Sequence, residues 1–273
     1  MLHTKIEIGK GNAFATTYFH ESNPEKKVVK RPVVVICPGG GYSFISYREG
    51  EPIALQFVAR GYHSLVLHYS IAPEARYPVA LTELGEVIKL LRERANEWHI
   101  DTEKIIIMGF SAGGHLVASY SCFWKRDFLS QALRCDSKML RPNGLMLGYP
   151  VITSGKFASI DSFHNLLGER FEELKREMSL ENQVSMDNPP TFLWHTKTDD
   201  DVPVENSIIF AEALKAQGVD AELHIFPEGR HGLALSNAVT AMDETQIVPS
   251  CQSWVELALN WINRSFGELS FKD

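Results

Sequence analysis

The Gly-x-Ser-x-Gly motif at Gly109–Gly113 is the sequence feature that most restricts how this chain can fold. The apolar run Ile105–Met108 leads directly into it, and small and apolar residues follow. This order predicts a buried strand, a sharp turn and a helix. A serine at such a turn leaves the relaxed backbone regions, so its neighbours two positions away must be small, as Gly109 and Gly113 are. The turn would place the Ser111 hydroxyl at a helix start, where backbone N–H groups converge.

Buried strands alternate with helices along most of the chain. Continuous β-branched or apolar runs predict strands at Pro32–Cys37, Ser64–Tyr69, Ile105–Met108, Leu145–Tyr149, Thr191–His195 and Ala221–Phe226. Apolar residues at helical spacing predict helices at Glu51–Arg60, 81–98, Glu205–Gln217 and 254–262. Two shorter strands near an edge are expected at Lys5–Ile8 and Ala13–His20. The alternation predicts an α/β fold, with a mostly parallel sheet and helices on both faces, in one domain of residues 1–273.

The stretch between Tyr149 and Thr191 does not fit this alternation. It is about forty residues long and includes the charged segment Glu169–Met178, which reads as a helix. A long insertion in a compact domain is usually functional or disordered. Because it follows a strand that ends at the carboxyl edge of the sheet, we expect residues 154–187 to form a small cap. An ordinary crossover helix with long loops is the alternative.

The chain also contains the partners that a reactive serine needs. A serine hydroxyl is a weak nucleophile until a base takes its proton, and a third group must orient that base. The acidic cluster Asp199–Asp201 follows the strand that ends near His195, and His231 follows the last strand on a glycine-flanked loop. We therefore expect His231 to be the base for Ser111. All three aspartates are candidates for the orienting acid.

A glycine run supplies candidate hydrogen-bond donors for the reaction. Attack on an ester carbonyl builds a negative oxygen, which needs preorganised N–H groups. Gly39–Gly41 follows the strand Pro32–Cys37 at the carboxyl edge of the sheet. Gly40 or Gly41, together with the N–H of Ala112, could form this oxyanion hole. A phosphate-binding loop is excluded because no Gly-Lys-Ser/Thr sequence follows the run.

Two other histidines lie close to these motifs. His115, inside the helix after Ser111, is expected to pack or to form a hydrogen bond there. His195 ends a strand near the site and could support it, although a structural role is the more frequent outcome for such a residue. No histidine pair has the spacing of metal ligands. We therefore predict no metal and no cofactor.

These motifs resemble those of known hydrolases. Gly109–His115 resembles the nucleophile elbow of the α/β-hydrolases, and Tyr69–Glu74 resembles the Tyr-Arg-Leu-Ala-Pro-Glu segment of hormone-sensitive-lipase-type esterases. Pro38–Tyr42 resembles their His-Gly-Gly-Gly motif, with proline in place of histidine. That version, together with Trp194–Thr196 and Gly229–Gly232, is more similar to carbohydrate esterases, namely acetyl-xylan and feruloyl esterases and small bacterial sugar hydrolases. The resemblance runs from about Val33 to Trp261.

The resemblance implies roles for individual residues. In proteins of this fold the acid commonly precedes Val-Pro with two residues between, and that register selects Asp199 over Asp200. Asp201 is then expected to cap the helix at Glu205. The implied catalytic residues are Ser111 as nucleophile, His231 as base and Asp199 as its orienter, with an oxyanion hole formed by Gly40, Gly41 and Ala112.

The function expected from the resemblance is that of a serine carboxylesterase. It would remove acetyl or other short acyl groups, from carbohydrates such as acetylated xylooligosaccharides. Pro38 and the absence of an N-terminal helical cap weigh against long-chain lipid substrates. One alternative is a serine peptidase resembling the prolyl oligopeptidase catalytic domain, although no propeller domain is visible. Another is a non-enzymatic binding protein on a hydrolase scaffold, although such proteins usually lose a triad member.

Charge and composition exclude several other classes. A net charge of −7 without a long basic block does not suit a nucleic-acid or anionic-membrane binder. No stretch approaches the roughly 20 apolar residues of a membrane helix, and Met1–Gly9 has no apolar leader. The four scattered cysteines suggest free thiols in a cytoplasmic protein. We expect a small-molecule ester as the partner and leave a homo-oligomer open.

Overall fold

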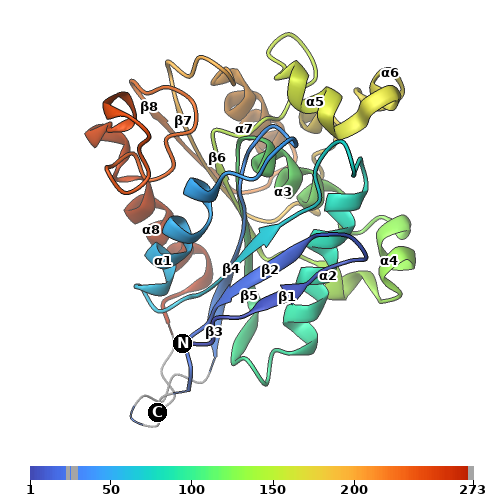
Figure 1. Cartoon of the computed structure of the whole chain (residues 1–273), viewed down its shortest axis with the longest axis vertical. Helices are drawn as coiled ribbons and strands as arrows, with labels where there is room; N and C mark the ends of the chain where they lie inside the picture. The colour runs from blue at the N-terminus through green and yellow to red at the C-terminus, as the bar shows by residue number, and fades with distance from the viewer. Residues whose placement is uncertain (23–24, 26–29, 270–273) are drawn as a thin grey trace.

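A twisted sheet forms the centre of the molecule (Figure 1). The structure, a computed structural model, describes residues 1–22, 25 and 30–269. Within these residues eight strands form one sheet in the order β1-β2-β4-β3-β5-β6-β7-β8. The strands are β1 (Lys5–Glu7), β2 (Phe14–Tyr18), β3 (Arg31–Cys37), β4 (His63–His68), β5 (Ile100–Phe110), β6 (Gly144–Gly148), β7 (Thr191–Thr196) and β8 (Ala221–Phe226). β2 pairs antiparallel with both β1 and β4, and the remaining neighbours, from β4 and β3 through to β7 and β8, pair parallel.

Helices cover both faces of this sheet, as predicted. Figure 1 shows α1 (Glu51–Val58) and α8 (Trp254–Phe266) on one side and α2 (Val79–Glu93) and α3 (Ser111–Phe123) on the other. α7 (Glu205–Ala216) contributes to the same core as α2 and α3, and α4 (Asp127–Leu133) packs on α2. The apolar side chains accordingly form two clusters, one on each face. The predicted α/β architecture is therefore confirmed.

The central strands have apolar sequences throughout because they are buried on both faces. Val33 to Ile36 of β3 pair in register with both β4 and β5, and all four residues are fully buried. A parallel strand covered on both faces has no position that favours a polar side chain. β5 begins at Ile100 instead of Ile105, because Arg31 pairs with Ile100 before a register shift restores the pairing at Val33.

The stretch after β6 differs from the sequence expectation in its helices. The predicted charged helix Glu169–Met178 is replaced by a 3-10 turn, η3 (Gly168–Arg170), and the short α6 (Phe171–Leu174). The main helix of the stretch is α5 (Ile160–Leu167), which buries Phe163, Leu166 and Leu167. Gly168 has φ +56°, a backbone conformation that interrupts a continuous helix at this point.

α5 and α6 lie together at one end of the molecule, beyond α3 (Figure 1). The segment is tied to the sheet region where Nε2 of His115 donates to the carbonyl of Met178 at 2.9 Å and the N–H of Leu180 donates to the carbonyl of Ile152. A cap over residues 154–187 remains a prediction, but α5 faces the cleft described below.

Two further observations concern the chain as a whole. All four cysteines carry free thiols. In the part of the chain that the structure describes, none of the helices combines the length and the apolar character needed to cross a membrane.

Candidate active site

Ser111 stands on a strained turn between β5 and α3. Its φ is +52°, in the left-handed region that a serine rarely adopts. The turn closes tightly: a Cβ on Gly109 would lie 2.2 Å from the carbonyl oxygen of Gly113, and a Cβ on Gly113 would lie 2.1 Å from that of Cys37. Only glycine fits either position, as the motif predicts. The turn leaves Ser111 9% exposed at the carboxyl edge of the sheet.

The structure brings Ser111, His231 and Asp199 together. Nε2 of His231 lies 2.8 Å from Oγ of Ser111, and Nδ1 of His231 lies 2.8 Å from Oδ2 of Asp199. Because a carboxylate can only accept, Nδ1 carries the proton and Nε2 accepts from the serine hydroxyl. This tautomer is the one that a general base for Ser111 requires. Ser111 begins α3 directly after β5, and Asp199 and His231 lie in the loops after β7 and β8; these three strand ends meet at one sheet edge.

The Asp199 carboxylate is held in a buried network. Oδ1 accepts the backbone N–H groups of Asp201 at 3.1 Å and Val202 at 2.8 Å. Oδ2 lies 3.2 Å from Nε2 of His195 in addition to its contact with His231. Burial alone would raise the pKa of Asp199, but the hydrogen bonds from His195 and His231 hold that pKa well below its usual value. Asp199 therefore stays ionised and orients the histidine.

The neighbouring aspartates have different contacts. Oδ1 of Asp200, on an exposed residue, accepts the backbone N–H of His231 at 3.3 Å. Asp201 was expected to cap the helix at Glu205, and this prediction is wrong. The residue that precedes α7 is Val204, whose φ of −54° and ψ of −23° are already helical, and no side chain caps this end. Asp199 is the aspartate whose side chain contacts the histidine ring.

The pKa of His231 reflects two opposing effects. Burial lowers it, whereas the hydrogen bond and the charge of Asp199 raise it, with smaller contributions from Asp201 and Glu49. The net result is a pKa above the ordinary value of a histidine. A raised pKa makes the ring a stronger base toward the serine proton, and protonation disables the base as the pH falls.

The glycine run after β3 lies beside Ser111. A Cβ on Gly39 would come within 2.9 Å of the Ser111 Cβ, so the two loops touch. Gly40 has φ +125°, and a Cβ there would lie 2.1 Å from the carbonyl oxygen of Phe44. The N–H of Gly39 donates to Oε2 of Glu49 at 2.7 Å. Within the described residues, the N–H groups of Gly40 and Gly41 have no hydrogen-bond acceptor, so they are available to a ligand.

Comparison with known proteins agrees with this geometry. The family described as alpha/beta hydrolase fold matches residues 34–235, well over half of the chain. The chain belongs to the alpha/beta hydrolase fold family. The resemblance inferred from the elbow, the glycine run and the histidine loop is thereby confirmed.

Three known proteins are similar to this chain over most of the length of this chain. Endo-1,4-beta-xylanase B from Butyrivibrio fibrisolvens is 36% identical over 83% of this chain and 35% of its own length. An acetylxylan esterase from Xylanibacter ruminicola is 29% identical over 82% of this chain and 45% of its own length. The chain thus spans about a third of the first relative and less than half of the second. The solved acetyl ester-xyloside bifunctional hydrolase from Caldicellulosiruptor lactoaceticus is 35% identical, covers 96% of this chain and 91% of its own, and has a TM-score of 0.80.

Ser111 and His231 of this alpha/beta hydrolase open onto a cleft of about 730 Å³. The cleft is lined by the loop after β3, by α5 and by the loops that carry Asp201 and Met242. Apolar side chains at its rim are exposed, Phe44 by 59% and Tyr47 by 76%. On its α5 side the cleft is lined by the polar residues Ser159, Asp161, Ser162 and Asn165 and by the apolar Ala158 and Ile160. Such a cleft suits a ligand with both apolar faces and hydroxyl groups.

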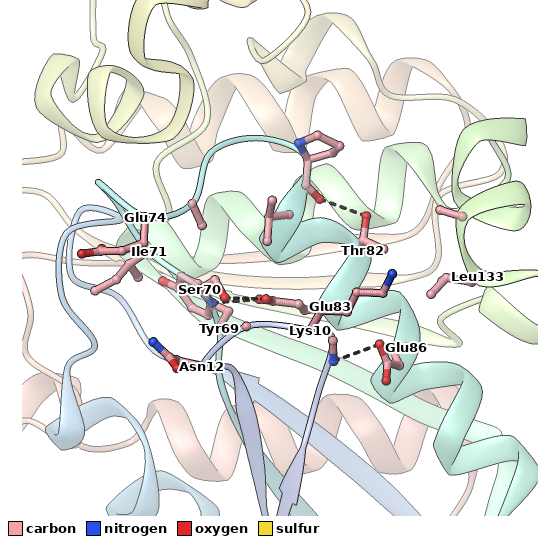
Figure 2. A pocket seen from close by; sticks show the side chains of 16 residues that line it. Lys10, Asn12, Tyr69, Ser70, Ile71, Glu74, Thr82, Glu83, Glu86 and Leu133 are labelled. Atoms are coloured by element: carbon pink, nitrogen blue, oxygen red, sulfur yellow. Dashed lines mark hydrogen bonds between the residues drawn. The ribbon is translucent and has the colours of Figure 1, made fainter.

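The segment Tyr69–Glu74, which resembles the esterase Tyr-Arg-Leu-Ala-Pro-Glu motif, contacts the residue that precedes the glycine run. The hydroxyl of Tyr69 donates to the carbonyl of Pro38 at 2.7 Å. Glu83 accepts from the N–H of Ser70 at 2.8 Å and from its hydroxyl at 2.5 Å, as Figure 2 shows. The cavity in Figure 2, of about 600 Å³, lies beside this segment and is lined by none of the three triad residues. The Tyr69 bond therefore fixes Pro38, the residue directly before the glycine run.

The structure gives His195 the supporting contacts that the sequence analysis left open, and it adds two residues that the sequence did not indicate, Asn165 and Glu49. His195 is fully buried, and its Nε2 also donates to the carbonyl of Val202 at 2.9 Å, so it braces the Asp199 loop. Asn165 of α5 donates to the carbonyl of Gly41 at 2.9 Å. Glu49 accepts from Gly39, as described above. No local pattern marks Asn165 or Glu49, because each meets its partner only after distant segments come together.

His115 shows the structural role that was expected of it. It is buried, Nδ1 accepts from the Tyr42 hydroxyl at 2.9 Å, and burial lowers its pKa to about 4. In the described part of the chain, no group of three or more His, Cys, Asp or Glu side chains is placed to hold a metal ion.

Proposed function

We propose that the protein is a serine carboxylesterase that removes acetyl or other short acyl groups from carbohydrate substrates such as acetylated xylooligosaccharides. The observation that carries this proposal is the continuous hydrogen-bond chain from Asp199 through His231 to Ser111. It ends at an open cleft, beside free N–H groups of Gly40 and Gly41. Asp199 orients the base, the base activates the nucleophile, and the N–H groups can donate hydrogen bonds to the negative charge that develops on the ester oxygen.

The reaction then proceeds in two halves. The Ser111 oxygen attacks the ester carbonyl while Nε2 of His231 takes its proton, and the resulting oxyanion binds the N–H groups of Gly40, Gly41 and Ala112. The tetrahedral intermediate collapses, the C–O bond to the alcohol breaks, and His231 gives its proton to the alcohol oxygen. Water enters, His231 removes one of its protons, and the hydroxide attacks the acyl-enzyme. Collapse releases the carboxylic acid and returns the proton to Ser111.

Two features support a sugar as the alcohol. The α5 side of the cleft offers Ser159, Asp161 and Asn165 as hydrogen-bonding groups for hydroxyls. The relatives named above include a xylanase, an acetylxylan esterase and an acetyl ester-xyloside hydrolase. The four free thiols support a reducing compartment such as the cytoplasm, where an imported acetylated oligosaccharide would be the substrate.

A substrate panel tests this proposal. Acetylated xylooligosaccharides, feruloyl esters, an aminoacyl amide and p-nitrophenyl esters of graded chain length are compared by kcat/KM. The proposal predicts the highest values for acetyl esters, a decline with acyl length, and acetate release from the oligosaccharides. Faster turnover of the amide than of the esters would instead indicate a peptidase. No turnover of any ester would reject the enzyme assignment.

A further inference from the structure

Glu49 is a buried carboxylate that the reaction steps above do not use. It is 3% exposed and ends the short 3-10 helix η1 (Tyr47–Glu49), directly before α1. Burying a carboxylate is costly unless its oxygens accept hydrogen bonds. Glu49 meets this condition with one strong bond on each oxygen. The two bonds lead to different halves of the catalytic site.

One oxygen of Glu49 fixes the oxyanion loop. Oε2 accepts the N–H of Gly39 at 2.7 Å, and a charged acceptor makes this bond stronger than a neutral one. The bond anchors the planar peptide unit between Pro38 and Gly39, at the point where the loop that carries the N–H groups of Gly40 and Gly41 leaves β3. The bond also occupies Gly39, which leaves the donor role to the two later glycines.

The other oxygen of Glu49 leads to the catalytic histidine. Oε1 accepts from the Tyr149 hydroxyl at 2.7 Å, and the same hydroxyl accepts the N–H of Ala234 at 2.9 Å. The Tyr149 ring packs edge-on against the His231 ring, with centroids 5.0 Å apart at 72°. Tyr149 is fully buried after β6, where Phe110 and Trp194 pack against its ring and the hydroxyl bonds fix its polar end. Glu49 thus holds the hydroxyl end of the ring that packs against His231.

Arg48, the neighbour of Glu49, binds the stretch of chain that follows His231. Its Nη1 donates to the carbonyls of Gly232 at 3.0 Å and Thr240 at 2.9 Å. Two consecutive residues of one short helix therefore contact both the loop that holds the oxyanion donors and the loop that holds the base. The pair links elements that lie far apart in the sequence.

We propose that Glu49 is a positioning residue that fixes the oxyanion loop through Gly39 and the base His231 through Tyr149. This inference rests on the proposed esterase function. Both parts that Glu49 holds act on the transition state, so their misplacement should lower kcat far more than it raises KM. A shift of about 1 Å in such groups can cost a factor of about 100 in rate.

The charge of Glu49 gives a second, independent readout. The groups that face His231 are the carboxylates of Asp199, Asp200, Asp201 and Glu49, the guanidinium of Arg48 and the ring of Tyr149. Removing one of these negative charges lowers the pKa of His231. Because the base works only when neutral, the acid limb of the kcat/KM profile then moves to lower pH. A purely structural role for Glu49 would leave this limb in place.

The test compares Glu49→Gln with wild type on p-nitrophenyl acetate. Glutamine keeps the shape but removes the charge and one acceptor oxygen. We expect kcat to fall by about 10-fold to 100-fold, KM to change by less than about threefold, and the acid limb to move to lower pH. The matched control is Glu51→Gln, the same change two positions on, at an exposed carboxylate that contacts Tyr18. The control should match wild type in kcat and in pH profile.

A second variant decides the case if Glu49→Gln does not fold. Tyr149→Phe keeps the ring against His231 and breaks the bond to Glu49, so kcat should fall by about tenfold while the acid limb stays in place. Wild-type kcat in either folded variant, or an unmoved acid limb in Glu49→Gln, would overturn the inference. Absence of esterase activity in wild type would reject the proposed function instead, so the two failures are distinguishable.

Discussion

At the scale of single residues, the site depends on a few close contacts that admit no larger atom. The strained Ser111 is possible because Gly109 and Gly113 let β5, α3 and the end of β3 approach within van der Waals distance. The same approach places Ser111 beside the glycine run. Geometry at this scale was predictable from the sequence, since the elbow motif itself demands small residues on each side.

Replacing Gly113 by alanine should therefore destabilise the protein and abolish activity. The new Cβ would lie 2.1 Å from the carbonyl oxygen of Cys37, and backbone must move to relieve the clash. We expect a loss of about 1–3 kcal/mol in the free energy of unfolding. Gly11→Ala is the control, since its Cβ would make an ordinary 3.4 Å contact with Ser70. Urea denaturation measures the free energy of unfolding of both variants. Equal stability of the two variants would contradict the packing argument.

The raised pKa of His231 predicts how activity depends on pH. The ring must be neutral to accept the serine proton, so kcat/KM should fall as the pH drops through a pKa above that of an ordinary histidine. Asp199→Asn removes the charge that raises this pKa, so the residual activity of this variant should persist to lower pH than that of wild type. A pH–rate profile of both proteins tests this. An identical acid limb would show that Asp199 does not set the pKa of the base.

At the scale of elements, the segment between β6 and β7, which includes α5, contacts both the glycine run and α3. Asn165 of α5 donates to the carbonyl of Gly41, and His115 of α3 donates to the carbonyl of Met178. These contacts join residues far apart in the sequence. This is why the sequence located the segment but missed α5 and predicted one helix over Glu169–Met178. The charge pattern over Glu169–Met178 is typical of a helix. In the structure, the positive φ of Gly168 and the burial of Phe163 place the main helix before this stretch instead.

Asn165→Ala should lower kcat/KM without unfolding the protein. The change frees the carbonyl of Gly41 and loosens the oxyanion loop, and we expect a loss of about 3-fold to 10-fold, less than for removal of an oxyanion donor itself. Asn182→Ala is the matched control, because it removes the same amide from an exposed site in the same segment. Kinetics on p-nitrophenyl acetate and melting curves measure both variants. Equal kinetics in the two variants would show that the contact between Asn165 of α5 and Gly41 does not affect the reaction.

At the scale of the whole molecule, strand order creates the site. β5, β6, β7 and β8 are consecutive neighbours in a parallel sheet, so the loops after β5, β7 and β8 end at one edge. The alternation of strands and helices predicted this arrangement, and the order serine, aspartate, histidine is the one known for this fold. The role of Glu49 could not be predicted in the same way. A glutamate just before a helix normally reads as a solvated first-turn charge, and its burial against Gly39 and Tyr149 arises only when the sheet is complete.

The proposed function depends on Ser111 being a nucleophile that His231 activates. Labelling with a serine-directed phosphonate, followed by mass analysis of the peptides, tests it most directly. We expect one adduct per chain, located on Ser111, lost in Ser111→Ala and strongly slowed in His231→Ala, because without the base the hydroxyl keeps its proton. A wild-type chain that takes up no phosphonate, or one that carries it on another residue, would contradict this role of Ser111.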